Sequence, residues 1–100
     1  MAIFEIGETV VCSVTVKNSS DTLVDPSTSM NIEIARIKPG YEAVVTSTAM
    51  SNDGVGLYHY DFQSADKSLG YYEVVYTATD GARISIQTDA LQLIYQRRVV

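Results

Sequence analysis

The alternation of polar and apolar residues is clearest in one stretch, which reads Gly70-Tyr71-Tyr72-Glu73-Val74-Val75-Tyr76-Thr77-Ala78-Thr79-Asp80. Every second residue from Tyr72 to Ala78 is apolar, whereas the positions between them include Glu73 and Thr77. A period of two with one apolar face is typical of a β-strand that is buried on one side. The pattern predicts a strand whose Tyr72 face packs into a core and whose Tyr71 face points outward.

Weaker versions of this alternation recur along the chain, separated by residues that favour turns. The expected strands are 3–6, 9–17, 29–37, 43–50, 56–62, 70–80, 83–87 and 90–95. Asn52-Asp53-Gly54 is expected to form a turn, and Thr88-Asp89 a bulge or kink between the last two strands. Seven or eight short strands with regular turn signals predict an all-β, antiparallel sandwich, in which 43–50 is expected at a sheet edge.

Length and composition predict one globular domain over 1–96, followed by a C-terminal tail over 97–100. The chain has 100 residues, of which 46% are hydrophobic and 19% charged, and its formal net charge is -5. The acidic balance disfavours nucleic acid as a partner, because phosphate binding needs clustered Lys and Arg. The sequence has no signal-peptide pattern, and no apolar run reaches the roughly 18 residues of a membrane span.

The side chains that carry catalysis are scarce, and the predicted strands separate them. Cys12 and His59 are the only residues of their kinds, and parity directs Cys12 inward and His59 outward. A Cys–His pair is therefore not expected, a single Cys excludes an intrachain disulfide, and the ligands for a transition metal are too few. Aspartates in the expected turns are assigned to turn geometry rather than to calcium. No enzymatic activity and no cofactor are predicted.

Four segments together resemble the immunoglobulin-like domains of bacterial, archaeal and phage proteins. They are Phe4-x-Ile6-Gly7-Glu8-x-Val10, Leu23-Val24-Asp25-Pro26, Asp53-Gly54-x-Gly56-x-Tyr58-x-Tyr60 and Leu69-Gly70-x-Tyr72-x-Val74-x-Tyr76-x-Ala78-x-Asp80-Gly81. The resemblance implies an immunoglobulin-like sandwich without a disulfide, found in virion-associated proteins and in modules of surface proteins. It also implies that Tyr72 is a tyrosine-corner residue, whose hydroxyl bonds back to the preceding loop.

The outward parity of two expected neighbouring strands carries a partly apolar set, formed by Tyr71, Val75, Ala35 and Ile37. Tyrosine is enriched at protein interfaces, and apolar patches often mark binding sites, although scattered apolar residues are also normal on a surface. This face is the first candidate interaction surface. The adjacent basic pair Arg97 and Arg98 in the tail is a candidate contact with an acidic neighbour, and the edge strand 43–50 is a third candidate.

Two functions remain open at this point. The first is a non-enzymatic structural or assembly protein, associated with a phage or virus particle at the head, neck or tail. It would act through protein–protein contacts with itself or other assembly proteins, in the virion or the host cytoplasm. The second is a ligand-binding or adhesion module of a larger microbial surface protein, which would bind carbohydrate through exposed tyrosines.

Overall fold

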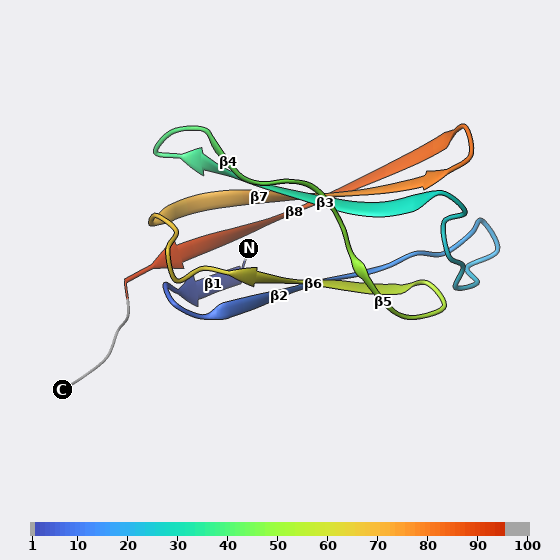
Figure 1. The fold of residues 1–100 in the computed structure, drawn as a ribbon, viewed down its shortest axis with the longest axis horizontal. Helices are drawn as coiled ribbons and strands as arrows, with labels where there is room; N and C mark the ends of the chain where they lie inside the picture. Colours follow the sequence, from blue (N-terminus) through green and yellow to red (C-terminus); the bar gives the residue numbers. More distant parts are fainter. Residues whose placement is uncertain (1, 96–100) are drawn as a thin grey trace.

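The computed structural model describes residues 2–95, and this part of the chain contains eight strands and no helix (Figure 1). The strands are β1 (Ala2–Glu5), β2 (Thr9–Thr15), β3 (Ser29–Lys38), β4 (Glu42–Ala49), β5 (Ser51–Gly54), β6 (Leu57–Gln63), β7 (Gly70–Asp80) and β8 (Arg83–Ile94). The all-β prediction is therefore confirmed. Within residues 2–95 there is no helix long and apolar enough to cross a membrane.

The strands form two sheets that face each other in a sandwich-like arrangement (Figure 1). The five-stranded sheet has the order β1-β8-β7-β3-β4, and the three-stranded sheet has the order β2-β6-β5. The segment expected at an edge, 43–50, corresponds to β4, which does lie at the edge of its sheet. The prediction of a wholly antiparallel sandwich is wrong at one pair, because β1 runs parallel to the end of β8, with Ala2 opposite Leu91.

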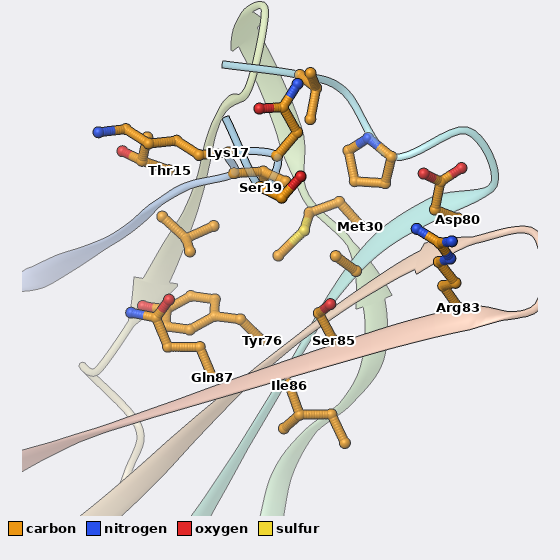
Figure 2. Close-up of a pocket in the computed structure, with 16 residues that line it drawn as sticks. Thr15, Lys17, Ser19, Met30, Tyr76, Asp80, Arg83, Ser85, Ile86 and Gln87 are labelled. Carbon is orange, nitrogen blue, oxygen red and sulfur yellow. The ribbon is translucent and has the colours of Figure 1, made fainter. Parts of the chain in front are cut away.

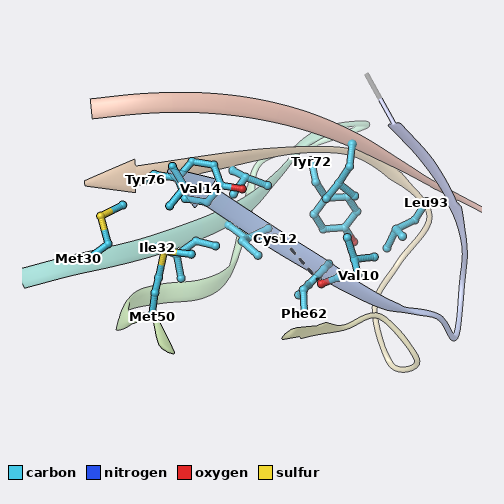
Figure 3. Packing of buried hydrophobic residues seen from close by; sticks show 13 residues of the cluster. Val10, Cys12, Val14, Met30, Ile32, Met50, Phe62, Tyr72, Tyr76 and Leu93 are labelled. Atoms are coloured by element: carbon cyan, nitrogen blue, oxygen red, sulfur yellow. Dashed lines mark hydrogen bonds between the residues drawn. The ribbon is translucent and has the colours of Figure 1, made fainter. Parts of the chain in front are cut away.

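The core lies between the two sheets and follows the predicted parity. Strand β2 alternates exposed and buried residues without exception, and β7 buries Tyr72, Val74 and Tyr76 against it. Phe62 and Tyr72 meet near one end, with ring centroids 5.9 Å apart. The buried cluster, shown in Figure 3, comprises Val10, Cys12, Val14, Met30, Ile32, Ile34, Met50, Phe62, Tyr72, Val74, Tyr76, Leu91 and Leu93.

Strand β8 is continuous, so the predicted bulge at Thr88-Asp89 is wrong. The register between β7 and β8 runs without a shift from Gly70 opposite Leu93 to Asp80 opposite Arg83. Along this uninterrupted strand the apolar residues change parity, from Ile84 and Ile86 to Leu91 and Leu93. Without a bulge, the two isoleucines lie on the outer face of the sheet while the two leucines lie in the core.

The turn predicted at Asn52-Asp53-Gly54 is also misplaced. These residues belong to β5, and the chain reverses one step later, at Val55 and Gly56. Gly56 has φ +72°, and a Cβ at this position would lie 2.6 Å from the carbonyl oxygen of Val16. The tight approach of this turn to the chain after β2 requires glycine here, which fixes the turn at Gly56 rather than at Gly54.

The two ends of the sandwich differ. We call the end that contains Phe62, Tyr72 and Leu93 the closed end, because these side chains are almost fully buried there. At the other end, all of β8 from Arg83 to Asp89 is exposed, and Figure 1 shows the β7–β8 hairpin diverging from the three-stranded sheet. We call this the open end.

Candidate interaction surfaces

The four residues predicted to share an outer face lie on neighbouring strands of the five-stranded sheet. Tyr71 and Val75 are on β7, and Ala35 and Ile37 are on β3, with β3 and β7 paired antiparallel. Tyr71 and Ile37 are exposed at 37% and 41%, while Ala35 and Val75 are half buried. The set is divided by Glu73, which lies between Tyr71 and Val75 on β7 and opposite Ala35 on β3. The face is therefore mixed rather than continuously apolar.

A shallow hollow of about 260 Å³ lies on the same face. Its lining includes Ala35 and Val75, together with Glu33, Glu73 and Tyr41. Tyr41 belongs to the connection between β3 and β4 and is 77% exposed. Sequence reasoning did not assign Tyr41 to this face, because a residue in a turn has no strand parity. The result is an exposed aromatic ring beside two carboxylates.

Among the large apolar side chains that lie in strands, the two most exposed are at the open end. Ile84 and Ile86 are 64% and 66% exposed. They sit opposite Thr79 and Thr77 of β7, on the outer face that also bears Tyr71. Neither isoleucine was assigned to a face from the sequence.

A larger hollow, of about 440 Å³, lies at the open end between the end of β2, the connection that follows it and the β7–β8 hairpin (Figure 2). Tyr76 and Met30 contribute apolar surface, and Lys17, Asp80 and Arg83 contribute charged groups. Figure 2 shows the side chains of Ser85 and Gln87 alongside Tyr76. The hollow exists because the hairpin diverges from the three-stranded sheet, which leaves the inner side of β8 uncovered.

Cys12 and His59 have opposite environments. Cys12 is buried at 5% exposure, and its thiol pKa is raised to about 11, chiefly by desolvation and secondarily by the charge of Asp89. A thiol with this pKa is protonated at neutral pH and is a poor nucleophile. His59 was predicted to be exposed but is half buried, because its Nδ1 lies 2.7 Å from Oδ2 of Asp53 on β5.

Tyr72 is fully buried and makes the hydrogen bond that the resemblance implies. Its hydroxyl donates to the carbonyl oxygen of Ser68, in the loop before β7, at 2.5 Å. Burial raises the pKa of the Tyr72 phenol above its usual value. The side chain thus joins the core of the closed end to the loop that leads into β7.

Asp25 connects the segment after β2 to the β5–β6 turn. One of its carboxylate oxygens accepts hydrogen bonds from the amide of Gly56 at 2.7 Å, the side chain of Asn52 at 3.1 Å and the hydroxyl of Tyr58 at 3.1 Å. These bonds, that from Gly56 first, lower the pKa of Asp25. Among the described residues, no group of three or more His, Cys, Asp or Glu side chains is arranged to hold a metal ion. The predicted contact at Arg97 and Arg98 lies outside the described residues.

Comparison with known proteins gives a fold likeness but no family. No family model and no curated protein match the chain. A similar fold occurs in the X-ray structure of the endo-beta-1,4-mannanase from Thermotoga petrophila, with a TM-score of 0.66 and 16% sequence identity over 95% of this chain. The chain spans only 18% of the length of that enzyme's chain. At this identity the likeness bears on the fold alone.

Proposed function

We propose that the chain is a non-enzymatic immunoglobulin-like domain that acts by protein–protein contact, in the assembly of a larger structure such as a phage or virus particle. The strand orders support the immunoglobulin-like part of the proposal. In such a fold, strands G, F, C and C′ form one sheet and strands B, E and D the other. The orders β8-β7-β3-β4 and β2-β6-β5 match these two sets, and Tyr72 occupies the position and makes the bond of a tyrosine corner.

The observation that carries the functional part is the exposure of Ile84 and Ile86 on a regular strand of the five-stranded sheet. Leaving such side chains in water forgoes roughly 1.5–3 kcal/mol each relative to full burial. Apolar side chains that share a face with Tyr71 and Val75 suit a surface that another protein covers.

Sedimentation velocity over a wide concentration range, combined with hydrogen–deuterium exchange at its two extremes, tests this function. We expect a defined multimer to form as concentration rises, with slower amide exchange in β7 and β8. Single monomeric behaviour at every concentration, with unchanged exchange in these strands, would overturn the proposal of assembly through this sheet.

A second candidate function rests on Tyr41. An aromatic ring offers an apolar face to a sugar, and the carboxylates of Glu33 and Glu73 can accept bonds from sugar hydroxyls. The hollow that these residues line would then make the chain a carbohydrate-binding module. The mannanase with the similar fold makes β-1,4-mannan oligosaccharides the first probe to use.

Calorimetric titration with these oligosaccharides decides this second function. Binding by the natural chain that is lost in Tyr41→Ala and kept in Tyr95→Ala supports it, since Tyr95 is similarly exposed but does not line the hollow. Absence of binding, or equal binding by both variants, would exclude the hollow as a site for these sugars.

A further inference from the structure

We propose that two copies of this chain associate by pairing the free edges of their β8 strands antiparallel, with Arg83 of each copy opposite Asp89 of the other. This inference rests on the proposed function and specifies its contact surface. The pairing would join two five-stranded sheets into one continuous sheet around a two-fold axis.

The free edge of β8 is long and regular. Strand β1 pairs with β8 only from Leu91 to Ile94, so within the described residues no strand covers this edge from Arg83 to Ala90. Of the edge strands, β4 is interrupted by register shifts in its pairing with β3, β5 is short and also shifted, and β1 has four residues. Strand β2 is also a regular edge, but it has seven residues against the twelve of β8. Bulges and short strands are the devices that protect an edge from pairing with another chain. The β8 edge has neither.

The backbone direction of β8 restricts the register. The carbonyl oxygen of Ile94 accepts a hydrogen bond from Ile6, on the β1 side of the strand. Successive residues of a strand direct their backbone N–H and C=O groups to opposite edges. Ile84, Ile86 and Thr88 therefore direct these groups to the same edge as Ile94, which is the free edge. Residues opposite each other in an antiparallel pair both face the partner or both face away. Only registers that pair residues of equal parity are therefore allowed.

One of the allowed registers pairs opposite charges. When Ile86 lies opposite its own copy, Ile84 faces Thr88, Ser85 faces Gln87 and Arg83 faces Asp89. Shifting by two residues places Arg83 opposite Gln87 or Leu91 instead. Among the described residues, neither Arg83 nor Asp89 forms an ion pair within its own chain. One carboxylate oxygen of Asp89 accepts a hydrogen bond from the amide of Ala90 at 2.8 Å, which leaves its other oxygen for Arg83 of the second copy. The two-fold symmetry forms the pair twice.

The same register also covers the exposed isoleucines. Ile86 would contact Ile86 of the second copy directly, and Ile84 would lie diagonally from it, within reach of a side-chain contact. Four isoleucines would then form one apolar cluster on the outer face of the joined sheet. The hollow at the open end, which Arg83, Ser85 and Gln87 help to line, would be flanked by the same residues of the second copy.

The net charge of the chain opposes association, and this sets the conditions for the experiment. Each copy carries a formal charge of -5, so two copies repel at long range. Salt near 0.15 M limits that repulsion to about 8 Å, whereas opposed Arg and Asp side chains across a strand pair lie closer than this. We therefore expect dimers at moderate salt.

Charge exchange between the two positions is the decisive experiment, with mass measured by light scattering and native mass spectrometry. Arg83→Asp and Asp89→Arg, each alone, place like charges opposite each other twice, and the dimer dissociation constant should rise about tenfold or more. The double variant should dimerise as the natural chain does, and an equimolar mixture of the two single variants should form mixed dimers. Lys38→Asp, on β3, changes the net charge as Arg83→Asp does; it is the matched control for that variant and should leave the dimer intact.

The outcomes separate this inference from the function on which it rests. A multimer whose stability is unaffected by either single exchange would overturn the β8 pairing while leaving assembly through another surface intact. Loss of the dimer in both single variants without mixed dimers would overturn the Arg83–Asp89 register. A chain that is monomeric at all concentrations would overturn both proposals. Because Arg83 and Asp89 are exposed, the thermal unfolding of each variant should match that of the natural chain in dilute solution, where every chain is monomeric.

Discussion

The two halves of β8 show what local sequence does and does not determine. Leu91 and Leu93 are 3% and 1% exposed, whereas Ile84 and Ile86, on the same uninterrupted strand, are exposed at 64% and 66%. All four side chains are large and aliphatic, and what separates them is parity and the presence of a facing sheet. A change of apolar parity along a regular strand thus marks the point where a core ends and an outward-facing apolar surface begins.

The largest expected effect comes from truncating one side chain in each half. Leu93→Ala removes a side chain from the packed core and should lower the free energy of unfolding by about 2–5 kcal/mol. Ile86→Ala, on the exposed half, should change it by less than about 0.5 kcal/mol in dilute solution, where the chain is monomeric. Urea denaturation monitored by tyrosine fluorescence measures both. Equal losses would mean that the open end is covered by its own chain.

The two glycines that flank β7 extend the comparison to the backbone. Gly70, at the closed end, has φ +145°, and a Cβ there would lie 2.1 Å from the carbonyl oxygen of Lys38. Gly81, in the hairpin turn of the open end, has φ +64° with no atom within 4 Å of such a Cβ. Gly70→Ala should therefore cost about 2–4 kcal/mol, from backbone strain and the clash together, and Gly81→Ala only about 1–2 kcal/mol of strain.

Thermal unfolding of the two alanine variants measures this difference. A smaller loss in Gly70→Ala than in Gly81→Ala would contradict the close packing of β3 against the start of β7.

Much of the fold could be predicted, because a strand that faces another sheet on one side alternates apolar and polar residues along its sequence. The parity of β2 and β7 places Cys12, Val14, Tyr72 and Val74 in the core, as expected. Which strands pair was harder to predict than which residues are buried. The parallel pairing of β1 with β8 depends on which sheet edge a short N-terminal strand joins. No local pattern encodes that position.

The candidate surfaces were predicted only in part. The outward position of Tyr71 follows from parity alone. Ile37 is exposed as expected, but it lies at a register shift, so that Lys38 is the residue opposite Tyr71. The neighbouring Tyr41 lies in a turn, where parity has no meaning. Ile84 and Ile86 were missed for a different reason. No face was predicted for either residue, since the expected bulge or kink at Thr88-Asp89 separated 83–87 from the strand that carries Leu91 and Leu93. Because β8 is continuous, the parity of the two isoleucines is opposite to that of the two leucines, which places them on the outer face of the sheet.

A pair of adjacent tyrosines tests the hydrogen bond of the closed end. Tyr72→Phe removes the hydroxyl that donates to Ser68 and leaves that carbonyl without its partner, so stability should fall by about 1–3 kcal/mol. Tyr71→Phe changes a hydroxyl on a side chain that is 37% exposed and should change stability by less than about 0.5 kcal/mol. Equal unfolding midpoints in denaturant for the two variants would show that the hydrogen bond from Tyr72 to Ser68 does not stabilise the fold.

The two ends should also respond differently to acid. At the closed end, Tyr72 makes its hydrogen bond through a neutral phenol. Beside the open end, Asp25 makes its hydrogen bonds through a carboxylate. The pKa of Asp25 is lowered from 3.8, first by the hydrogen bond from the Gly56 amide. A lowered pKa in the folded state means that ionisation favours folding above pH 3.8. That contribution is lost as the pH falls through the lowered pKa.

The stability difference between the natural chain and Asp25→Asn should therefore be constant near neutral pH and shrink below about pH 4, where the natural carboxyl also becomes uncharged. Denaturant titrations at a series of pH values give this difference, and Glu73→Gln on β7 gives the effect of one lost negative charge alone. A difference that stays constant into strong acid, or grows there, would show that Asp25 holds the β5–β6 turn through its shape rather than through its charge. The stability difference between the natural chain and Tyr72→Phe should stay constant over the same acid range, because the phenol does not ionise there.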